Sequence, residues 1–277
     1  MRRRWRELRR ARLALPGAAV VCAFAVAALL APWLAPADPT RSDLANVLAR
    51  PGVAHLLGTD ELGRDVFSRI VHGARLSMLE GLFAVALAVT LGVPLGLAAG
   101  YAGGAVDTVI MRFVDVLLAF PGVLLAVAVV SILGPGLWNA MVAVAIYTVP
   151  IFARLARGST LVVKREAYIE GCHALGMSAL RIVGRHVLPN IAAPLLVMSA
   201  LRVAVAILTA ASLSFLGLGA QPPTPEWGAM LSNGRNYVLI APHLVIFPGL
   251  AILLLVLGLN LLQEGLRLAL DPRLTER

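Results

Sequence analysis

Five long stretches of this 277-residue chain contain no Asp, Glu, Lys or Arg. They run from Leu13 to Ala37, Gly81 to Val106, Val116 to Ala153, Val203 to Pro225 and Asn236 to Gln263. Each is long enough for a helix of about 20 residues, which crosses a hydrocarbon core of about 30 Å. The third is too long for one crossing, and Gly134-Pro135-Gly136 in its middle predicts the turn of a helical hairpin. With 59% apolar residues, the sequence predicts an all-α integral membrane protein with six transmembrane helices.

The formal net charge of +9 can indicate nucleic-acid binding, but the distribution of charge argues against nucleic acid as a partner. Basic residues gather before the first predicted helix and after the fourth: Arg2, Arg3, Arg4, Arg6, Arg9, Arg10 and Arg12, then Arg154, Arg157, Lys164, Arg165, Arg181 and Arg185. Because positive charge concentrates on the cytoplasmic side of membrane proteins, we expect both termini in the cytoplasm. The first apolar stretch is long for a signal peptide, and we expect an uncleaved anchor rather than a removed leader.

A polar stretch, residues 168–190, separates the fourth and fifth predicted helices and must therefore lie in water. Residues 164–175 favour a helix, and Gly176 can break it. Ser178 can cap a second short helix, and Pro189 can open the next long one. The sequence predicts two short helices joined by a glycine elbow on the cytoplasmic side.

Another polar stretch, residues 38–76, is expected on the outer side of the membrane. Thr59 or Asp60 can cap a helix in this stretch. The apolar face of that helix would lie along the membrane surface and would consist of Leu62, Val66, Phe67 and Ile70.

Few polar groups lie within the predicted transmembrane helices, which we place at residues 77–99, 112–133, 137–152, after Pro189 and 243–262. Glycines 92, 96 and 100, with Pro94, give the second helix a small face that permits close packing. Arg112 and Asp115 are one turn apart in the third, so we expect a structural ion pair rather than a substrate site. Arg202 in the fifth would cost about 2.5 to 3.5 kcal/mol at the bilayer centre. It should therefore face protein or a water-filled cavity, or reach out from near one end.

The cytoplasmic stretch carries the first resemblance to a known family. Glu170, Gly176 and Leu188-Pro189 are spaced as in the cytoplasmic loop of permease subunits of binding-protein-dependent ABC importers. Here Gly171 and Cys172 replace two alanines of the pattern, and His186 replaces an isoleucine.

Two outer patterns narrow the resemblance. The sequence HLLGTDELGRDVFSR at residues 55–69, and SFLGLG followed by P-x-x-x-W-G at residues 214–228, resemble the C-type permease subunit of the dipeptide, oligopeptide and nickel importer family. The resemblance covers residues 55–273, including the tail from Leu266 to Arg273. Many members carry an acidic residue where this chain has Ala210, so a charge that is often found near the translocation path is missing here.

The resemblance implies a type I ABC importer permease fold with a cytoplasmic coupling-helix loop, in the bacterial inner membrane. Residues 1–76 would form an N-terminal cytoplasmic segment, the first transmembrane helix and the external amphipathic loop, and residues 77–277 a core permease domain with five transmembrane helices. The implied partners are a second homologous permease subunit, two ATP-binding subunits, an external solute-binding protein and membrane lipid. ATP and Mg²⁺ would be bound by the ATP-binding subunits and no cofactor by this chain.

Candidate site residues fall in three groups. The predicted ATPase-coupling loop comprises Glu170, Gly171, Cys172, Ala174, Leu175, Gly176, Leu188 and Pro189. Candidates for lining the translocation path are Tyr147, Thr148, Arg202, Thr209 and Ser212. Candidates for contact with the binding protein are Pro222, Pro223, Glu226 and Trp227, although the proline-rich loop could equally be a rigid turn.

The sequence offers no residues for catalysis. It lacks a phosphate-binding loop of the G-x-x-x-x-G-K-[ST] type, a G-x-S-x-G element and an H-E-x-x-H element. Its five histidines lie scattered, so no metal site is expected. We expect a non-catalytic permease for di- or oligopeptides, with nickel import as the alternative within the family. A membrane scaffold or enzyme without an ATPase partner is the alternative of another class.

Overall fold

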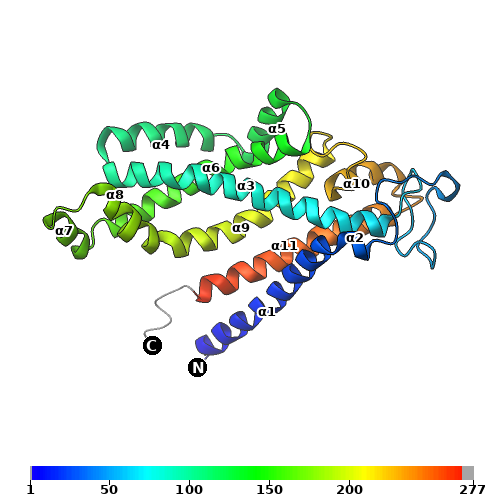
Figure 1. The fold of residues 1–277 in the computed structure, drawn as a ribbon, viewed down its shortest axis with the longest axis horizontal. Coiled ribbons are helices and arrows are strands. Elements are labelled where there is room, and N and C mark those ends of the chain that lie inside the picture. Colours follow the sequence, from blue (N-terminus) through cyan, green and yellow to red (C-terminus); the bar gives the residue numbers. More distant parts are fainter. Residues whose placement is uncertain (1, 270–277) are drawn as a thin grey trace.

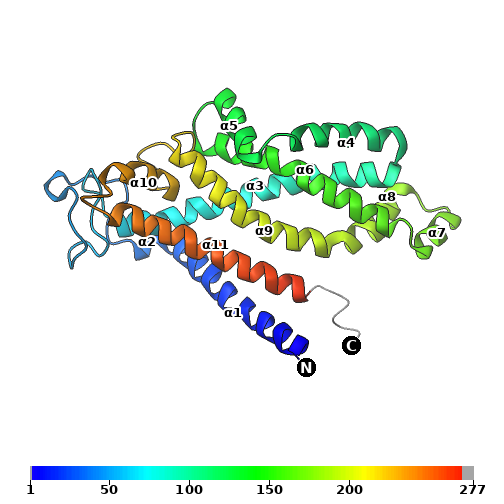
Figure 2. The same cartoon turned by 180° about the vertical axis from the view of Figure 1, so that it is seen from behind.

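The computed structural model describes the backbone of residues 2–269 and the side chains of residues 14–269. It is an elongated bundle of helices, with the loop before α3 at one end and α7 at the other (Figures 1 and 2). The helices are α1 (Arg2–Leu29), α2 (Ala31–Leu34), η1 (Leu44–Asn46), α3 (Val66–Ala102), α4 (Gly104–Leu118), α5 (Gly122–Leu133), α6 (Leu137–Val163), α7 (Ala167–Ala174), α8 (Ala179–Ile182), η2 (Val183–Val187), α9 (Leu188–Phe215), α10 (Trp227–Gly234), η3 (Arg235–Tyr237) and α11 (His243–Ala269).

Four helices are long and apolar enough to cross a membrane: α3, α6, α11 and the continuous helix from Ala179 to Phe215. The pair α4 and α5 would make a fifth crossing if it counts as one span. The apolar part of α1, Ala14–Leu29, is shorter than these. The all-helical membrane class is therefore confirmed, with four or five crossings by length and composition rather than the six expected.

The third predicted span, residues 112–133, is not one straight helix. It is divided between α4 and α5, which meet at an angle of 91°. The break falls at Phe120-Pro121-Gly122, where Pro121 precedes the first residue of α5. Proline disfavours a helical conformation at the residue before it and lacks an N–H donor, so the helix ends there.

The amphipathic helix expected from Thr59 or Asp60 is also absent from the described structure. Residues 58–65 form a tight turn instead, and α3 begins at Val66 with Asp65 as its N-cap. The Asp65 carboxylate accepts a hydrogen bond from the Ser68 N–H at 2.8 Å. Val66, Phe67 and Ile70 therefore belong to the first turns of α3, a 37-residue helix, and Leu62 precedes it.

Close packing of α3 on α6 forms the centre of the bundle. Gly92, Gly96 and Gly100 lie on one face of α3, as expected from their spacing, and each faces the backbone of α6. A methyl group at Gly92 would lie 2.6 Å from the Val149 carbonyl oxygen, and one at Gly96 would overlap the Ala153 carbonyl oxygen. The small face predicted for this helix is confirmed as its contact with α6.

Substituting Gly96 with leucine should therefore prevent α3 from seating on α6. Backbone atoms cannot move aside as a flexible side chain can, so we expect a cost of at least about 3 kcal/mol. Thermal unfolding in detergent, followed by gel filtration, would measure the loss of the folded protein. Gly158→Leu on α6 is the matched control, because no atom lies within 4 Å of a methyl group placed there. Equal destabilisation by both variants would contradict the packing argument.

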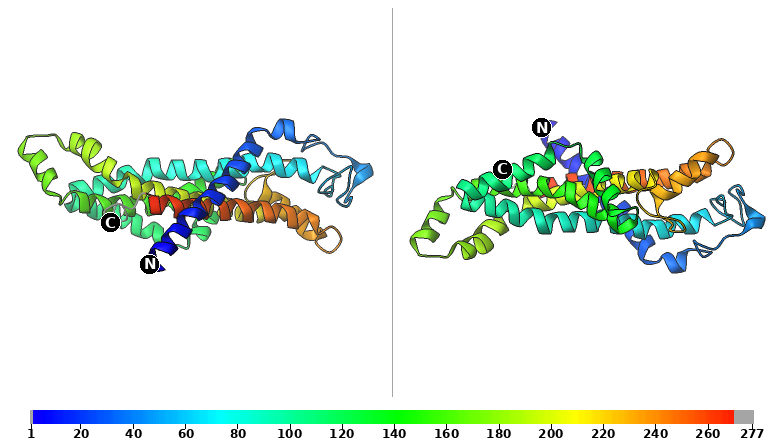
Figure 3. Two further views of the ribbon diagram at one scale, coloured as in Figure 1. Left: turned by 90° about the horizontal axis from the view of Figure 1, so that it is seen from below. Right: turned by 90° about the horizontal axis from the view of Figure 1, so that it is seen from above.

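The first helix packs against the last. Gly17 of α1 faces Leu261 and Leu262 of α11, and Gly258 of α11 faces Val20 of α1. Figure 3 shows α1 crossing the bundle obliquely. The start of α1 and the end of α11 lie on the side of the bundle that carries α7 (Figure 1).

Candidate functional site

The cytoplasmic loop predicted from sequence forms a distinct projection at one end of the bundle. Within it, α7 buries Ile169 and Cys172 and exposes Glu170. Gly176 has a φ of 71°, a conformation that favours glycine, and it turns the chain after α7. The Met177 N–H donates to the Cys172 carbonyl oxygen at 3.1 Å, which closes this turn. The first short helix and the glycine elbow are confirmed, but the helix begins at Ala167 and residues 164–166 form a turn instead of its first residues.

The second half of the loop differs from the prediction. Ser178 occupies the N-cap position of α8, but its side chain makes no capping hydrogen bond. α8 is not a separate short helix, because it continues through the π-helical segment η2 into α9. Pro189 lies in the first turn of α9 and cannot donate to a carbonyl one turn earlier, which accounts for the widened turn before it.

Side-chain contacts from α3 and α9 hold α7 in place. Lys164, at the end of α6, donates from Nζ to the Tyr101 carbonyl oxygen at 2.6 Å and lies over the Tyr101 ring. The Tyr101 hydroxyl lies 3.3 Å from Nε2 of His173 on α7. On the other side, the Asn190 amide donates to the Tyr168 hydroxyl at 3.1 Å. A force on α7 would therefore reach α3, α6 and α9.

The tip of the loop exposes an apolar and acidic surface, which we define by Glu170, Leu175 and Leu180. Leu175 is 83% exposed and Leu180 is 88% exposed. Gly171, Ala174 and Gly176 are exposed between them. Large apolar side chains presented together at a loop tip are typical of a protein contact. Of the other predicted loop residues, Leu188 and Pro189 are exposed at the start of α9.

Two ion pairs join α4 to the second half of α6. Arg154 contacts Asp115 at 2.5 Å, and Arg157 holds Asp107 through two hydrogen bonds of 2.5 and 2.6 Å. The expected pairing of Asp115 with Arg112 is therefore wrong. The chain reversal between α4 and α6 brings a distant arginine closer to Asp115 than its helical neighbour.

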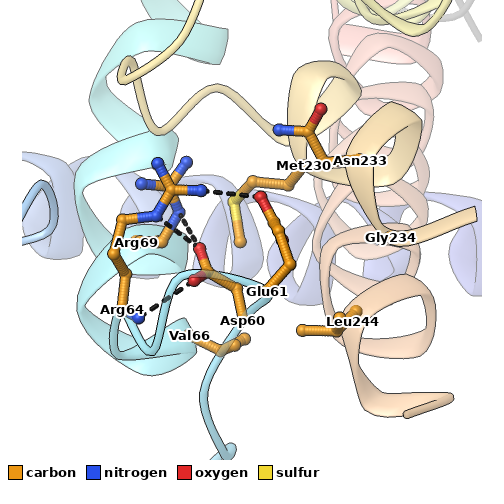
Figure 4. A pocket seen from close by; sticks show the side chains of 9 residues that line it. All are labelled: Asp60, Glu61, Arg64, Val66, Arg69, Met230, Asn233, Gly234 and Leu244. Carbon is orange, nitrogen blue, oxygen red and sulfur yellow. Dashed lines mark hydrogen bonds and ion pairs between the residues drawn. The ribbon is translucent and has the colours of Figure 1, made fainter. Parts of the chain in front are cut away.

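At the opposite end of the bundle, the turn before α3 builds a buried polar cluster (Figure 4). The Asp60 carboxylate accepts from Nε of Arg64 at 2.7 Å and lies 3.4 Å from Nε of Arg69. Glu61 accepts from Nη2 of Arg64 at 2.8 Å. Both arginines are only 2% exposed. Buried charges of this kind require pairing, and the HLLGTDELGRDVFSR stretch supplies both partners. In this structure the stretch therefore stabilises the turn before α3.

Arg69 also joins three segments that are distant in sequence. Its Nη1 donates to the carbonyl oxygens of Pro39 at 2.7 Å and Pro223 at 3.2 Å, and its Nη2 reaches that of Thr224 at 3.5 Å. The loop before α3 and the loop before α10 are thereby fixed to the first turn of α3.

The candidate contacts for a binding protein divide into two kinds. Pro222 and Pro223 are exposed, whereas Glu226 and Trp227 are fully buried. Glu226 caps α10 by accepting from the N–H groups of Gly228 at 2.7 Å and Ala229 at 2.8 Å. Burial raises the pKa of Glu226 above its ordinary value, while these two hydrogen bonds act in the opposite direction. The Trp227 indole donates to the Ile70 carbonyl oxygen at 3.0 Å.

The candidate path residues also lie in different surroundings. Tyr147, Thr148 and Thr209 are buried, with the hydroxyls of Tyr147 and Thr209 3.2 Å apart. Arg202 and Ser212 are partly exposed. The Ser212 hydroxyl donates to the Leu208 carbonyl oxygen, and both residues line an apolar groove between α9, α10 and α11. Nε of Arg202 has no hydrogen-bond partner within residues 14–269.

One buried acidic residue was not predicted from the sequence. Glu80 lies on α3, is 1% exposed, and neither of its carboxylate oxygens has a hydrogen-bond partner among the described residues. The adjacent Gly81 packs against Ile207 of α9. The signal was present as a lone acidic residue at the edge of an apolar run.

Within residues 14–269, no three His, Cys, Asp or Glu side chains come close enough to hold a metal ion. The tail pattern from Leu270 to Arg273 and the side chains of the basic residues before Ala14 lie outside the described residues.

Comparison with known proteins agrees with the sequence resemblance. Residues 92–276 match the family described as binding-protein-dependent transport system inner membrane component, and residues 1–51 match the N-terminal transmembrane domain of oligopeptide transport permease C. The chain is 52% identical, over 98% of its length and 89% of the relative, to a glutathione transport system permease protein of Shigella flexneri serotype 5b. A relative of the same name in Escherichia coli O6:K15:H31 is 50% identical over the same shares.

The fold also has solved counterparts. An inward-facing structure of the MetNI methionine ABC transporter superposes with a TM-score of 0.60 and 18% identity, covering 74% of this chain and 97% of that chain. A second crystal form of that transporter gives a TM-score of 0.59. These figures show a shared fold. Together with the family match over two thirds of the sequence, they establish that the chain is a multi-pass ABC importer permease subunit of the dipeptide, oligopeptide and nickel family.

Proposed function

We propose that this chain forms half of the translocation path of an ATP-driven importer for glutathione-like peptides. The observation that supports this solute most strongly is the identity of about half, over nearly the whole chain, to permeases named for glutathione transport. A general di- or oligopeptide importer is the broader form of the same proposal. No described residue cluster favours nickel, which serves as a comparison solute below.

The proposed assembly contains a second homologous permease, two ATP-binding subunits that bind ATP and Mg²⁺, and an external solute-binding protein. Exposed apolar side chains on α4 and α5 support contact with the second permease or with lipid. They include Val109 at 69%, Phe113 at 60%, Leu124 at 62% and Ile132 at 85% exposure. We place six spans in the inner membrane, counting α1 and the α4–α5 pair as one each, with residues 1–76 as the anchor and outer loop and residues 77–277 as the core.

Within this assembly, α7 and its glycine elbow would dock in a groove of an ATP-binding subunit. Glu170 would meet a basic or polar group there, and Leu175 and Leu180 would cover apolar surface. Closure of the two ATP-binding subunits would displace α7 and, through its contacts with α3, α6 and α9, move the bundle. This orientation would put the start of α1 and the end of α11 on the cytoplasmic side, because both lie on the side of the bundle that carries α7 (Figure 1). The outer loop at Pro222 and Pro223 would then face the binding protein.

Arg202 is the path candidate that best suits a peptide carrying carboxylates. Its guanidinium stands in an apolar helix without an ion pair among residues 14–269, and such a group attracts a carboxylate in a low-dielectric environment. The other candidates are less suited to bind solute in this conformation, because Tyr147, Thr148 and Thr209 are buried by packing. Ser212 places a hydroxyl beside the groove between α9, α10 and α11.

Purification of the tagged chain in mild detergent, with identification of every co-purifying protein, tests the assembly. We expect a second permease and ATP-binding subunits. ATPase activity of the reconstituted complex with its binding protein should rise on addition of glutathione, more than with a dipeptide or a nickel chelate. Arg202→Gln should reduce that stimulation while leaving the subunit composition unchanged. Recovery of the chain alone would refute the importer assembly, and stimulation by nickel chelate alone would refute the solute.

A further inference from the structure

Glu80 is a buried acid for which the structure supplies no compensation. Its two carboxylate oxygens and the Ser77 hydroxyl, one turn earlier on α3, have no hydrogen-bond partner within the described residues. Both side chains are 1% exposed. Native proteins pair nearly all buried polar atoms, so three unpaired oxygens on one face of a helix require an explanation.

The turns of α3 on either side of Glu80 pack closely against α9 and α10. On one side, Gly81 packs against the Ile207 side chain and the Val203 carbonyl of α9. On the outer side, Gly73 packs against the Trp227 ring at the start of α10. An ionised carboxylate in such a place would lose its hydration without gaining a counter-charge, whereas a neutral carboxylic acid loses far less.

Charged and polar groups on the neighbouring elements, apart from Arg202, are engaged elsewhere. Arg69 is held by Asp60 and three carbonyl oxygens, Tyr147 bonds Thr209, and His243 of α11 contacts the Thr59 carbonyl. Arg202 directly precedes Val203 on α9, and it does not pair with Glu80, because both Glu80 oxygens and Nε of Arg202 have no hydrogen-bond partner within residues 14–269. Glu226, the buried cap of α10, accepts two backbone N–H groups and precedes Trp227, whose ring packs against Gly73 on the same helix as Glu80. Two buried carboxylates near each other disfavour each other's ionisation.

A metal ion does not suit this arrangement. Magnesium and calcium take at least six oxygen ligands. The free oxygens are those of Glu80 and Ser77, because both oxygens of Glu226 already accept backbone N–H groups. A proton needs no coordination shell and neutralises the acid directly.

We propose that Glu80 is a proton-binding site between α3, α9 and α10, and that it carries its proton at neutral pH. Loss of the proton would place a second negative charge beside Glu226 and push α10 away from α3. Proton occupancy would thereby couple the closure of the outer end of the bundle to pH. This inference rests on the chain's own packing and stands whether or not glutathione is the solute.

Infrared spectroscopy of the purified complex tests the site directly. At neutral pH we expect a carbonyl band of a protonated carboxylic acid that shifts in heavy water and is missing in the Glu80→Gln variant. Glu166→Gln, which removes an exposed carboxylate at the start of α7, should leave the band unchanged. Absence of the band in the unmodified complex would overturn the proposal, and this measurement does not depend on any variant folding.

Thermal unfolding gives a second, independent readout. At neutral pH the folded chain would hold a proton that the unfolded chain releases, so raising the pH favours unfolding. Between neutral and alkaline pH, the midpoint of the unmodified complex should fall by at least about 3 °C relative to Glu80→Gln. Parallel pH profiles would contradict the proposal. So would a midpoint that rises with sodium chloride but not with choline chloride, which would indicate a bound sodium ion.

Discussion

Replacing Glu170 with alanine should abolish most transport while leaving the chain correctly inserted. The Glu170 side chain is exposed, and it makes no hydrogen bond or ion pair within residues 14–269, so the fold does not depend on it. A hydrogen bond to a charged group in a partner contributes about 1.5 to 3 kcal/mol. Its loss should weaken docking of the ATP-binding subunit by about 10- to 100-fold.

The measurement is solute uptake by membrane vesicles, with quantification of the ATP-binding subunit that co-purifies with the variant. Glu166→Ala is the matched control, since it removes the same charge from the start of α7, four residues before Glu170. We expect it to retain most uptake. Normal uptake by Glu170→Ala would show that the exposed surface of α7 does not transmit the energy of ATP hydrolysis.

Replacing the buried Arg69 with methionine should cause a large loss of stability at the end of the bundle where α3 begins. Methionine keeps an unbranched apolar stem like that of arginine, but it is shorter and removes every donor. The carbonyl oxygens of Pro39, Pro223 and Thr224 would lose their shared partner, and Asp60 would lose one of its two arginines. Breaking a buried charge network from one side costs about 3 to 5 kcal/mol.

Thermal unfolding of the purified complex should show a midpoint lower by about 10 °C. Limited proteolysis should cut the loops at residues 38–65 and 217–226 sooner, because both are fixed by this one guanidinium. Arg75→Met provides the comparison, as Arg75 is exposed on the same helix six residues further on. If the two variants unfolded at the same temperature, the buried network would not hold the outer loops.

The membrane class and the cytoplasmic loop were predictable because both depend on local sequence. Charge-free runs identify apolar helices whatever their neighbours, and the spacing from Glu170 to Gly176 marks α7 and its elbow. The corner at Pro121 was not predicted because it lies inside an uninterrupted apolar run. Hydropathy indicates how long such a run is but not where the helix changes direction. The start of α3 was misplaced because Asp65 is as good a cap as Asp60, and local preference does not choose between them.

Contacts between distant segments were beyond the reach of the sequence. Asp115 pairs with Arg154, 39 residues away, because the α4–α5 corner folds the chain back onto α6. Glu80 was overlooked because it stands immediately before a run that begins at Gly81. Its burial results from the packing of α9 and α10, which no pattern within α3 reveals.

The unbroken helix from Ala179 to Phe215 gives the chain a lever. Its 37 residues extend over about 55 Å, nearly twice the thickness of a hydrocarbon core. A tilt of about 5° around its midpoint would carry each tip by about 2 Å in opposite directions. A displacement at the end that carries α7 would thus reach the opposite end of the bundle through one helix, which can bend at the π-helical turn and at Pro194.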